Sequence, residues 1–137
     1  MIVAANARLS GKKRVTPLLN SPFIDEIVGR PTYLKAECLQ HSGSFKFRGA
    51  FSAISALTSE ERESGILAYS SGNHAQGIAM AATMHNVPST VIMPEDAPKI
   101  KIGIINLNFW CILRHNYSRR YAVHCCRHCY TLCVISG

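Results

Sequence analysis

Two short stretches of this 137-residue sequence place chemically useful side chains where helices are expected to begin. In the first, residues 44–50 (SFKFRGA), Lys46 and Arg48 fall in the first helical turn. The helix dipole disfavours positive charge there, so stability alone does not explain the two cations. One use for such a lysine is an amine biased toward its neutral, nucleophilic form. A solvated lysine at an exposed helix start is the competing interpretation.

The second stretch, residues 70–77 (SSGNHAQG), joins the end of an expected strand to the start of an expected helix. Backbone N–H groups at such a junction, at the carboxyl edge of a parallel sheet, can bind an anion. Gly72 lets a ligand approach the backbone closely, and Asn73 offers a donor and an acceptor. A plain helix cap and turn is the alternative, and His74 by itself indicates a structural hydrogen bond more than a general base.

Local patterns predict the elements that must position these residues. Apolar side chains at positions 47, 50, 51, 54 and 57 predict a helix over residues 45–57 with one buried face. Residues 66–69 and 89–93 predict buried strands, and residues 74–85 between them predict a helix. Strand, helix and strand form a βαβ unit whose two strands should be parallel. A further helix should begin at Pro98.

Upstream of this unit the sequence predicts smaller elements. Residues 2–9 are compatible with a short helix, and residues 32–37 alternate as a strand does. Between them, Ser21 and Pro22 are typical of a helix start, and Gly29 is a natural stop. Together with the βαβ unit, these elements predict an α/β protein.

Several motifs occur in order and resemble the fold-type II pyridoxal-phosphate enzymes, most closely the serine/threonine dehydratase and serine racemase branch. The likeness runs from about Val15 to Ile102, and the residues that carry it are 16–18 (TPL), 35–40 (KAECLQ), 43–50 (GSFKFRGA), 71–77 (SGNHAQG) and 93–99 (MPEDAPK). The resemblance implies a partial three-layer αβα parallel-sheet domain of the tryptophan synthase β-like type, which this chain leaves incomplete.

The same resemblance implies roles for the residues at the two expected helix starts. Lys46 would hold pyridoxal 5'-phosphate as a Schiff base, and Phe45 would flank its pyridine ring. Asn73 would bind the ring hydroxyl. The loop 71–74 would bind the substrate carboxylate through backbone N–H groups, from Ser71, Gly72, Asn73 and His74. In racemases of this branch a serine at position 71 is a second catalytic acid/base on the opposite face of the substrate.

The activity implied by the resemblance is deamination of L-threonine or L-serine by β-elimination, which yields a 2-oxo acid and ammonia. Serine racemase and 3-hydroxyaspartate ammonia-lyase activities are the alternatives, and the motifs do not choose among them. The expected partner is a small amino-acid substrate, and complete members of the family are expected to be homo-oligomers.

The character of the chain changes after Ile102. All eight acidic residues lie at or before Asp96, whereas residues 103–137 hold four arginines and five of the six cysteines. We therefore expect residues 1–45 to belong to a larger domain absent from this chain and residues 46–102 to form part of the small domain. Residues 103–137 would be a poorly ordered tail, unrelated to the family, that arises from a shifted reading frame and does not pack on the domain.

The tail also bears on the cofactor. The family's glycine-rich loop for the cofactor phosphate has no equivalent, because the tail contains only Gly103 and Gly137. The chain is therefore expected to be an inactive fragment that does not retain pyridoxal phosphate.

A non-catalytic fragment with a metal-binding tail is the alternative from another class. Thiol and imidazole side chains that could hold Zn²⁺ are clustered at His124, Cys125, Cys126, His128, Cys129 and Cys133. A typical zinc site has two ligand pairs separated by a folded loop, whereas these ligands lie within ten residues. We therefore expect no metal site.

The remaining composition argues against two classes of partner. The net charge of +7 is divided unevenly along the chain, and the tail arginines follow no helical stripe, so nucleic-acid binding is not expected. No apolar run reaches the roughly 18 residues of a membrane span. The start of the chain lacks the apolar core of a secretion signal, and we expect a cytoplasmic protein.

Overall fold

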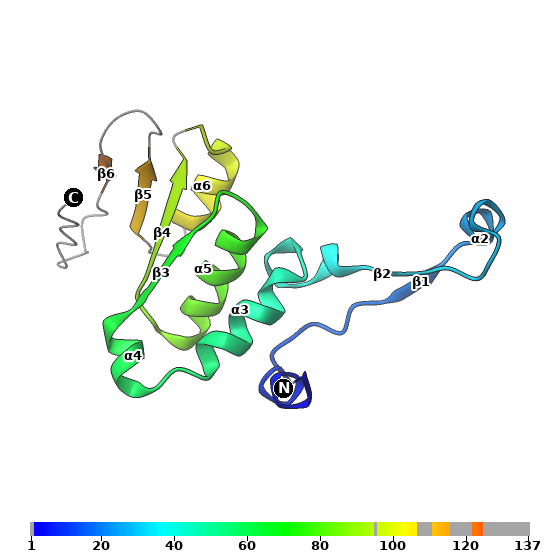
Figure 1. Ribbon diagram of the computed structural model, residues 1–137, viewed down its shortest axis with the longest axis horizontal. Helices are drawn as coiled ribbons and strands as arrows, with labels where there is room; N and C mark the ends of the chain where they lie inside the picture. Colours follow the sequence, from blue (N-terminus) through cyan, green and yellow to red (C-terminus); the bar gives the residue numbers. More distant parts are fainter. Residues whose placement is uncertain (1, 95, 107–110, 116–121, 125–137) are drawn as a thin grey trace.

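The computed structural model describes residues 2–94, 96–106, 111–115 and 122–124. They form an N-terminal arm and a body made of a sheet with helices packed along it (Figure 1). The helices are α1 (Ile2–Arg8), α2 (Pro22–Val28), α3 (Lys46–Ser55), α4 (Ser59–Ser64), α5 (Asn73–His85) and α6 (Lys99–Asn106). The strands are β1 (Leu18–Asn20), β2 (Tyr33–Lys35), β3 (Ile66–Tyr69), β4 (Ser89–Pro94), β5 (Cys111–His115) and β6 (Ala122–His124), and two 3-10 turns are η1 (Glu37–Leu39) and η2 (His41–Gly43).

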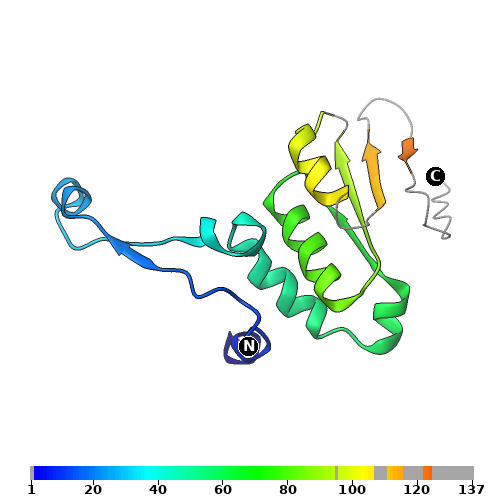
Figure 2. The ribbon, with the colours of Figure 1, turned by 180° about the vertical axis from the view of Figure 1, so that it is seen from behind.

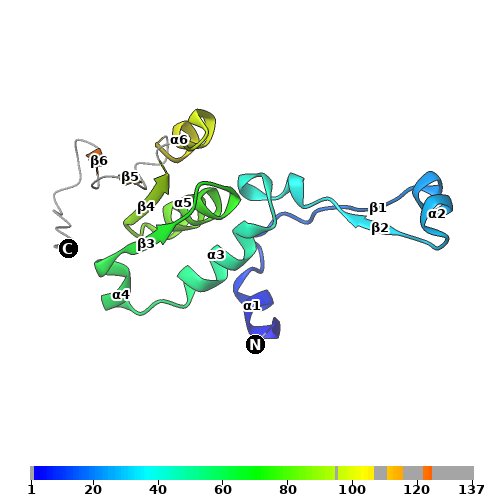
Figure 3. The same cartoon turned by 45° about the horizontal axis from the view of Figure 1, so that its top comes forward.

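The arm consists of the antiparallel pair β1–β2 with α2 at its tip, and it projects away from the body (Figures 1 and 3). The predicted bounds of α2 are confirmed, with Pro22 at its start and Gly29 in the left-handed region at φ 76°. Asp25 holds the tip together, because its carboxylate accepts the Thr32 N–H at 2.6 Å and the Asn20 amide at 2.9 Å. None of β1, α2 and β2 contributes a buried residue.

The body confirms the predicted βαβ unit. β3 and β4 are parallel, with Ile66 opposite Ser89 and Tyr69 opposite Ile92, and α5 connects them. The strand order is β3-β4-β5-β6, in which β5 is parallel to β4 and β6 is antiparallel to β5. The α/β class and the parallel arrangement of β3, β4 and β5 are therefore as expected, whereas the antiparallel β6 makes the described sheet mixed.

The core lies between α3, α5 and β4. α5 packs on β3 and β4, and α3 lies side by side with α5 (Figures 1 and 2). The predicted apolar face of α3 is confirmed. Alanines line the buried faces of α5, and these small side chains allow it to lie close to both neighbours. The fully buried side chains of the core include Phe47, Ala75, Ala79, Val91 and Met93.

Strand β3 differs from the prediction of a buried strand. Its burial alternates, and Leu67 and Tyr69 are 59% and 58% exposed. β4 alternates in the same way, with Val91 and Met93 buried and Ile92 half-buried. In the described part of the chain only one face of these strands is fully covered, which a short apolar run does not reveal.

The end of the chain also differs from expectation. α6 continues past Ile102 to Asn106, and Cys111–His115 pairs along β4 as strand β5, where we expected no strand. Apart from Ala122–His124 in β6, residues 116–137 lie outside the described residues, and the origin of the tail in a shifted reading frame stays a prediction. None of the described helices is long and apolar enough to span a membrane.

Candidate functional site

Lys46 is the first residue of α3, as the sequence predicts. Its side chain is exposed, and Nζ lies 5.0 Å from the centroid of the Phe45 ring, which is 57% exposed. An amine and an aromatic face therefore stand next to each other on the surface. The arrangement can hold a flat ligand with an aldehyde group, because the amine reacts with the aldehyde while the ring covers one face.

The loop 71–74 follows β3 and leads into α5. Ser70 anchors it, because the Ser70 N–H donates to the Ile92 carbonyl at 3.0 Å and its Oγ accepts the Gly72 N–H at 3.2 Å. One of the four N–H groups predicted to bind a carboxylate is thus engaged within the loop. Asn73 and His74 are exposed at the first turn of α5, where backbone N–H groups have no helical partner.

Gly77 connects the two helix starts. A β-carbon on Gly77 would lie 3.1 Å from the Lys46 carbonyl carbon and 3.1 Å from the Phe47 nitrogen. Since Gly77 is one helical turn after Asn73, the loop 71–74 lies roughly 6 Å along α5 from this contact. The fold therefore brings the backbone of Lys46 against α5, about one helical turn after the loop 71–74, although the two motifs are separate in the sequence.

An ion pair holds the first turn of α3 through Arg48. Its guanidinium donates two hydrogen bonds to the Glu37 carboxylate, both of 2.7 Å, and the Thr16 hydroxyl donates a third at 2.7 Å. The Arg48 hydrogen bonds, with smaller help from Thr16, lower the pKa of Glu37 from 4.5 to about 2. This partner explains why Arg48 is tolerated at a helix start, and the sequence interpretation missed it.

Gln40 ties the loop that follows α1 to η2. It is 1% exposed, accepts the backbone N–H groups of Arg14 at 2.9 Å and His41 at 3.0 Å, and donates to the Arg14 carbonyl at 2.9 Å. Glu37 and Gln40 both lie in the motif 35–40, so membership in that motif was the signal that could have identified them.

The predicted site is an open surface in the described part of the chain. Of its hollows, two of about 450 and 600 Å³ are lined neither by Lys46 nor by the loop 71–74. The larger hollow adjoins Phe45 and Arg48. The site residues are therefore not enclosed by the residues that the structure describes.

These residues fit one end of pyridoxal phosphate. An exposed amine, an aromatic ring, an amide side chain and free helix N–H groups suit its aldehyde, its ring and a bound carboxylate. For the phosphate, the sequence contains no glycine-rich stretch, since no two of its nine glycines are closer than five positions. No group of three metal ligands occurs in the described residues, and Cys125, Cys126, His128, Cys129 and Cys133 of the zinc alternative lie outside them.

Comparison with known proteins agrees with this chemistry. The model of the family "Pyridoxal-phosphate dependent enzyme" matches residues 9–108. The L-threo-3-hydroxyaspartate ammonia-lyase of Saccharomyces cerevisiae is 46% identical over 102 residues, which are 74% of this chain and 31% of the yeast protein. The L-threonine ammonia-lyase of Thermotoga maritima is 49% identical over 87 residues, which are 64% of this chain and 22% of that protein.

A solved structure shows the same fold. The serine racemase of Dictyostelium discoideum superposes with a TM-score of 0.81 at 37% identity, over 85% of this chain and 38% of the racemase. The chain thus spans about a third or less of the length of the two curated relatives.

Proposed function

The chain belongs to the family of pyridoxal-phosphate dependent enzymes, and we propose that it carries the lysine-bearing part of an enzyme that deaminates L-threonine or L-serine. The reaction would be a β-elimination that yields a 2-oxo acid and ammonia. The ammonia-lyase names of the yeast and Thermotoga relatives support this proposal. The single observation that supports it is the close approach of Gly77, in the second turn of α5 after the loop 71–74, to the backbone of Lys46.

Each of the described site residues would have its own role in binding or catalysis. When bound, pyridoxal phosphate supplies an electron sink for the negative charge that develops at the substrate α-carbon. Lys46 Nζ would hold the cofactor and then take the proton from the α-carbon, while Phe45 would cover the ring. Asn73 would bind the ring hydroxyl, and the N–H groups at the start of α5 would hold the substrate carboxylate.

Racemisation of serine is the alternative that a specific residue favours. A racemase needs a proton donor on the face of the substrate opposite the lysine, and Ser71 offers a half-buried hydroxyl in the loop 71–74. Elimination from 3-hydroxyaspartate is a second alternative, supported by the yeast relative. We further propose that the complete enzyme is a cytoplasmic homo-oligomer and that this chain alone is an inactive part of it.

The test restores the remainder of the fold. Residues 1–102 are joined to the corresponding remainder of the yeast ammonia-lyase, and elimination from L-threonine, L-serine and 3-hydroxyaspartate is measured. Lys46→Ala should reduce elimination below detection, whereas Lys99→Ala, a change at the start of α6, should leave it unchanged. Elimination at the unaltered rate in the Lys46→Ala chimera would refute the assignment.

The same chimera separates elimination from racemisation. If Ser71 is the opposite-face acid/base, Ser71→Ala should lower racemisation about 10²-fold, with elimination from the L-substrate within a few-fold of the starting value. Elimination needs proton removal on one face only, so the two rates can move apart. An equal loss of both would mean that Ser71 serves the shape of the carboxylate loop.

A further inference from the structure

Gly77 lies where α5 passes over the peptide that joins Lys46 to Phe47. The atoms that a β-carbon would meet are the Lys46 carbonyl carbon at 3.1 Å, the Phe47 nitrogen at 3.1 Å and the Lys46 oxygen at 3.3 Å. All three belong to the backbone, which cannot turn aside as the end of a side chain can. A side chain at position 77 would therefore push the two helices apart by a few tenths of an ångström.

The backbone conformation at this position does not require glycine. The glycines with positive φ in the described residues are Gly11, Gly29, Gly43 and Gly65, and Gly77 is not among them. Glycine also weakens a helix relative to alanine, and alanine fills the other small positions of α5. The reason for glycine at position 77 is therefore the space that it leaves for α3.

The other side of the same turn is also held. Arg48, two residues after Lys46, is fixed by its two hydrogen bonds to Glu37. The start of α3 thus lies between a backbone contact with α5 and an ion pair with the segment after β2. Neither contact involves the Lys46 side chain, so both act on the position of its backbone.

We propose that Gly77 is a positioning residue, which sets the distance between Lys46 and the loop 71–74 by letting the backbones of α3 and α5 touch. The proposal rests on the proposed function, because the distance matters only if Lys46 and the loop 71–74 act on the same ligand. Groups that act on one ligand must be placed to within a fraction of an ångström. A shift of a few tenths of an ångström at Gly77 should therefore weaken their joint action without unfolding the domain.

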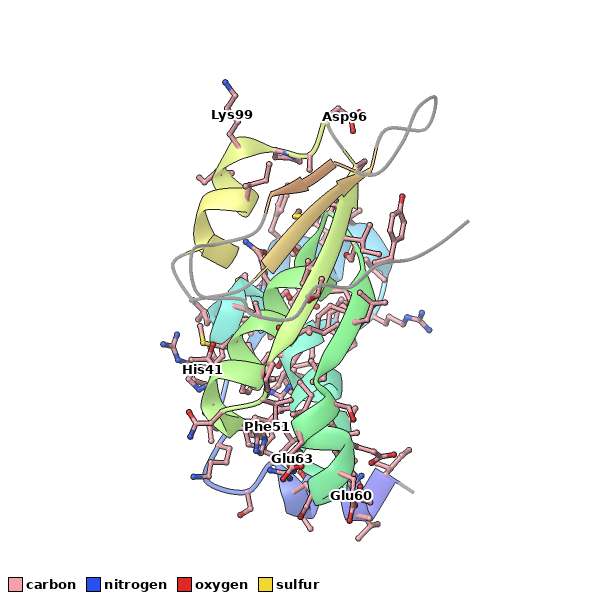
Figure 4. All side chains as sticks on the ribbon, turned by 90° about the vertical axis from the view of Figure 1, so that its left-hand side faces the viewer. His41, Phe51, Glu60, Glu63, Asp96 and Lys99 are labelled. Carbon is pink, nitrogen blue, oxygen red and sulfur yellow. The ribbon has the colours of Figure 1, made fainter. Side chains whose placement is uncertain are left out.

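The test compares Gly77→Ala with Gly49→Ala in the full chain. The second change is matched, because Gly49 lies in α3 and has nothing within 4 Å of its would-be β-carbon. Each protein is mixed with excess pyridoxal phosphate and reduced with borohydride, which fixes the cofactor to reactive amines. Mass spectrometry then gives the ratio of label on Lys46 to label on Lys99. Lys99 is an exposed first residue of a helix like Lys46, and it points outward at one end of the body (Figure 4).

We expect label on Lys46 to exceed label on Lys99 in the unchanged chain, and Gly77→Ala to lower this ratio several-fold. Gly49→Ala should leave the ratio unchanged. A third variant, Ala82→Gly, weakens the other end of α5 and should lower stability without changing the ratio, which separates positioning from folding. An unchanged ratio in Gly77→Ala, with preference for Lys46 in the unchanged chain, would overturn the inference.

A geometric measurement keeps the inference separate from the proposed function. In the unchanged chain, NMR should show a nuclear Overhauser effect between a Gly77 α-hydrogen and the Phe47 amide hydrogen. Its absence would overturn the inference even if the variant failed to fold. If the effect is present but Lys46 shows no labelling preference, the proposed function fails while the contact stands.

Discussion

At the scale of single residues, the structure separates two cations that the sequence treats alike. Lys46 and Arg48 both lie in the first turn of α3, where positive charge is disfavoured. Arg48 has a carboxylate partner in Glu37, whereas Lys46 extends its amine over the exposed Phe45 ring. The ion pair with Glu37 therefore explains Arg48, whereas Lys46 remains the candidate for a reactive amine.

The Glu37–Arg48 pair predicts a particular pH dependence of stability. Because the pKa of Glu37 falls from 4.5 to about 2 on folding, its stabilising effect is complete above pH 4.5 and is lost as the pH falls toward 2. The two side chains are 18% and 26% exposed, between a surface pair and a buried one. We expect Glu37→Gln to cost about 1–2 kcal/mol at pH 7.

Urea unfolding at a series of pH values checks this prediction. The difference in stability between Glu37→Gln and the unchanged chain should shrink as the pH falls from 4.5 toward 2. Over this range Glu37 of the unchanged chain becomes protonated first in the unfolded state and, near pH 2, in the folded state, where it then carries no more charge than glutamine. Glu63→Gln, on the exposed face of α4, is the control and should change stability little (Figure 4). A difference that stays constant down to pH 2 would argue against the ion pair.

At the scale of elements, short helices depend on their ends. α4 has only six residues and no buried side chain, so it gains little from packing of its own. A capping box starts it: Thr58 Oγ1 accepts the Glu61 N–H at 3.3 Å, and Glu61 Oε2 accepts the Thr58 N–H at 2.8 Å. Neither α4 nor its cap was among the elements expected from the sequence.

Thr58→Ala should therefore lower the free energy of unfolding by about 1 kcal/mol, because the Glu61 N–H at the start of α4 loses its side-chain partner. The loss should appear in chemical denaturation and as faster amide hydrogen exchange at residues 61–64. Ser59→Ala changes an exposed neighbour within the helix and serves as the comparison. Equal losses in the two variants would show that the cap contributes nothing special.

At the scale of the whole molecule, the described residues would form only one side of the proposed site. The arm exposes apolar side chains along its length, including Phe23 at 71% and Ile27 at 70%, and the body leaves one face of β3 open. The matched residues make up only 31% of the yeast relative and 22% of the Thermotoga relative. The proposed site is likewise incomplete, because Lys46 lies on an open surface and lines neither of the two hollows.

We accordingly predict that the chain does not retain pyridoxal phosphate. Cofactor sites need several preorganised contacts, and the described residues supply them only for the aldehyde and ring. After mixing with the cofactor and dialysis, the protein should lack the visible absorbance of a lysine-bound cofactor. The chimera with the yeast remainder is the positive control and should keep the band. A stable band with one cofactor per chain in the unchanged protein would contradict the prediction.

The sequence by itself determined most of the local elements before residue 102, α4 excepted, and the family. Pro22 and Gly29 bound α2, Asn86 ends α5 in the left-handed conformation at φ 54°, and the apolar spacing of α3 identifies its buried face. These signals work because capping and amphipathic spacing act within one or two turns of the chain. The ordered motifs around Lys46 and the loop 71–74 likewise identified the family that the comparisons show.

Only the tertiary structure decided which of these residues touch. Gly77 meets the Lys46 backbone because α3 and α5 lie side by side, and Glu37 reaches Arg48 because the segment after β2 returns to the start of α3. The open face of β3 and the pairing of Cys111–His115 with β4 likewise depend on which elements become neighbours. Such contacts join residues far apart in the sequence. Local patterns of hydrophobicity and capping cannot predict them, because the distance between two packed backbones depends on how the side chains of both helices fit together.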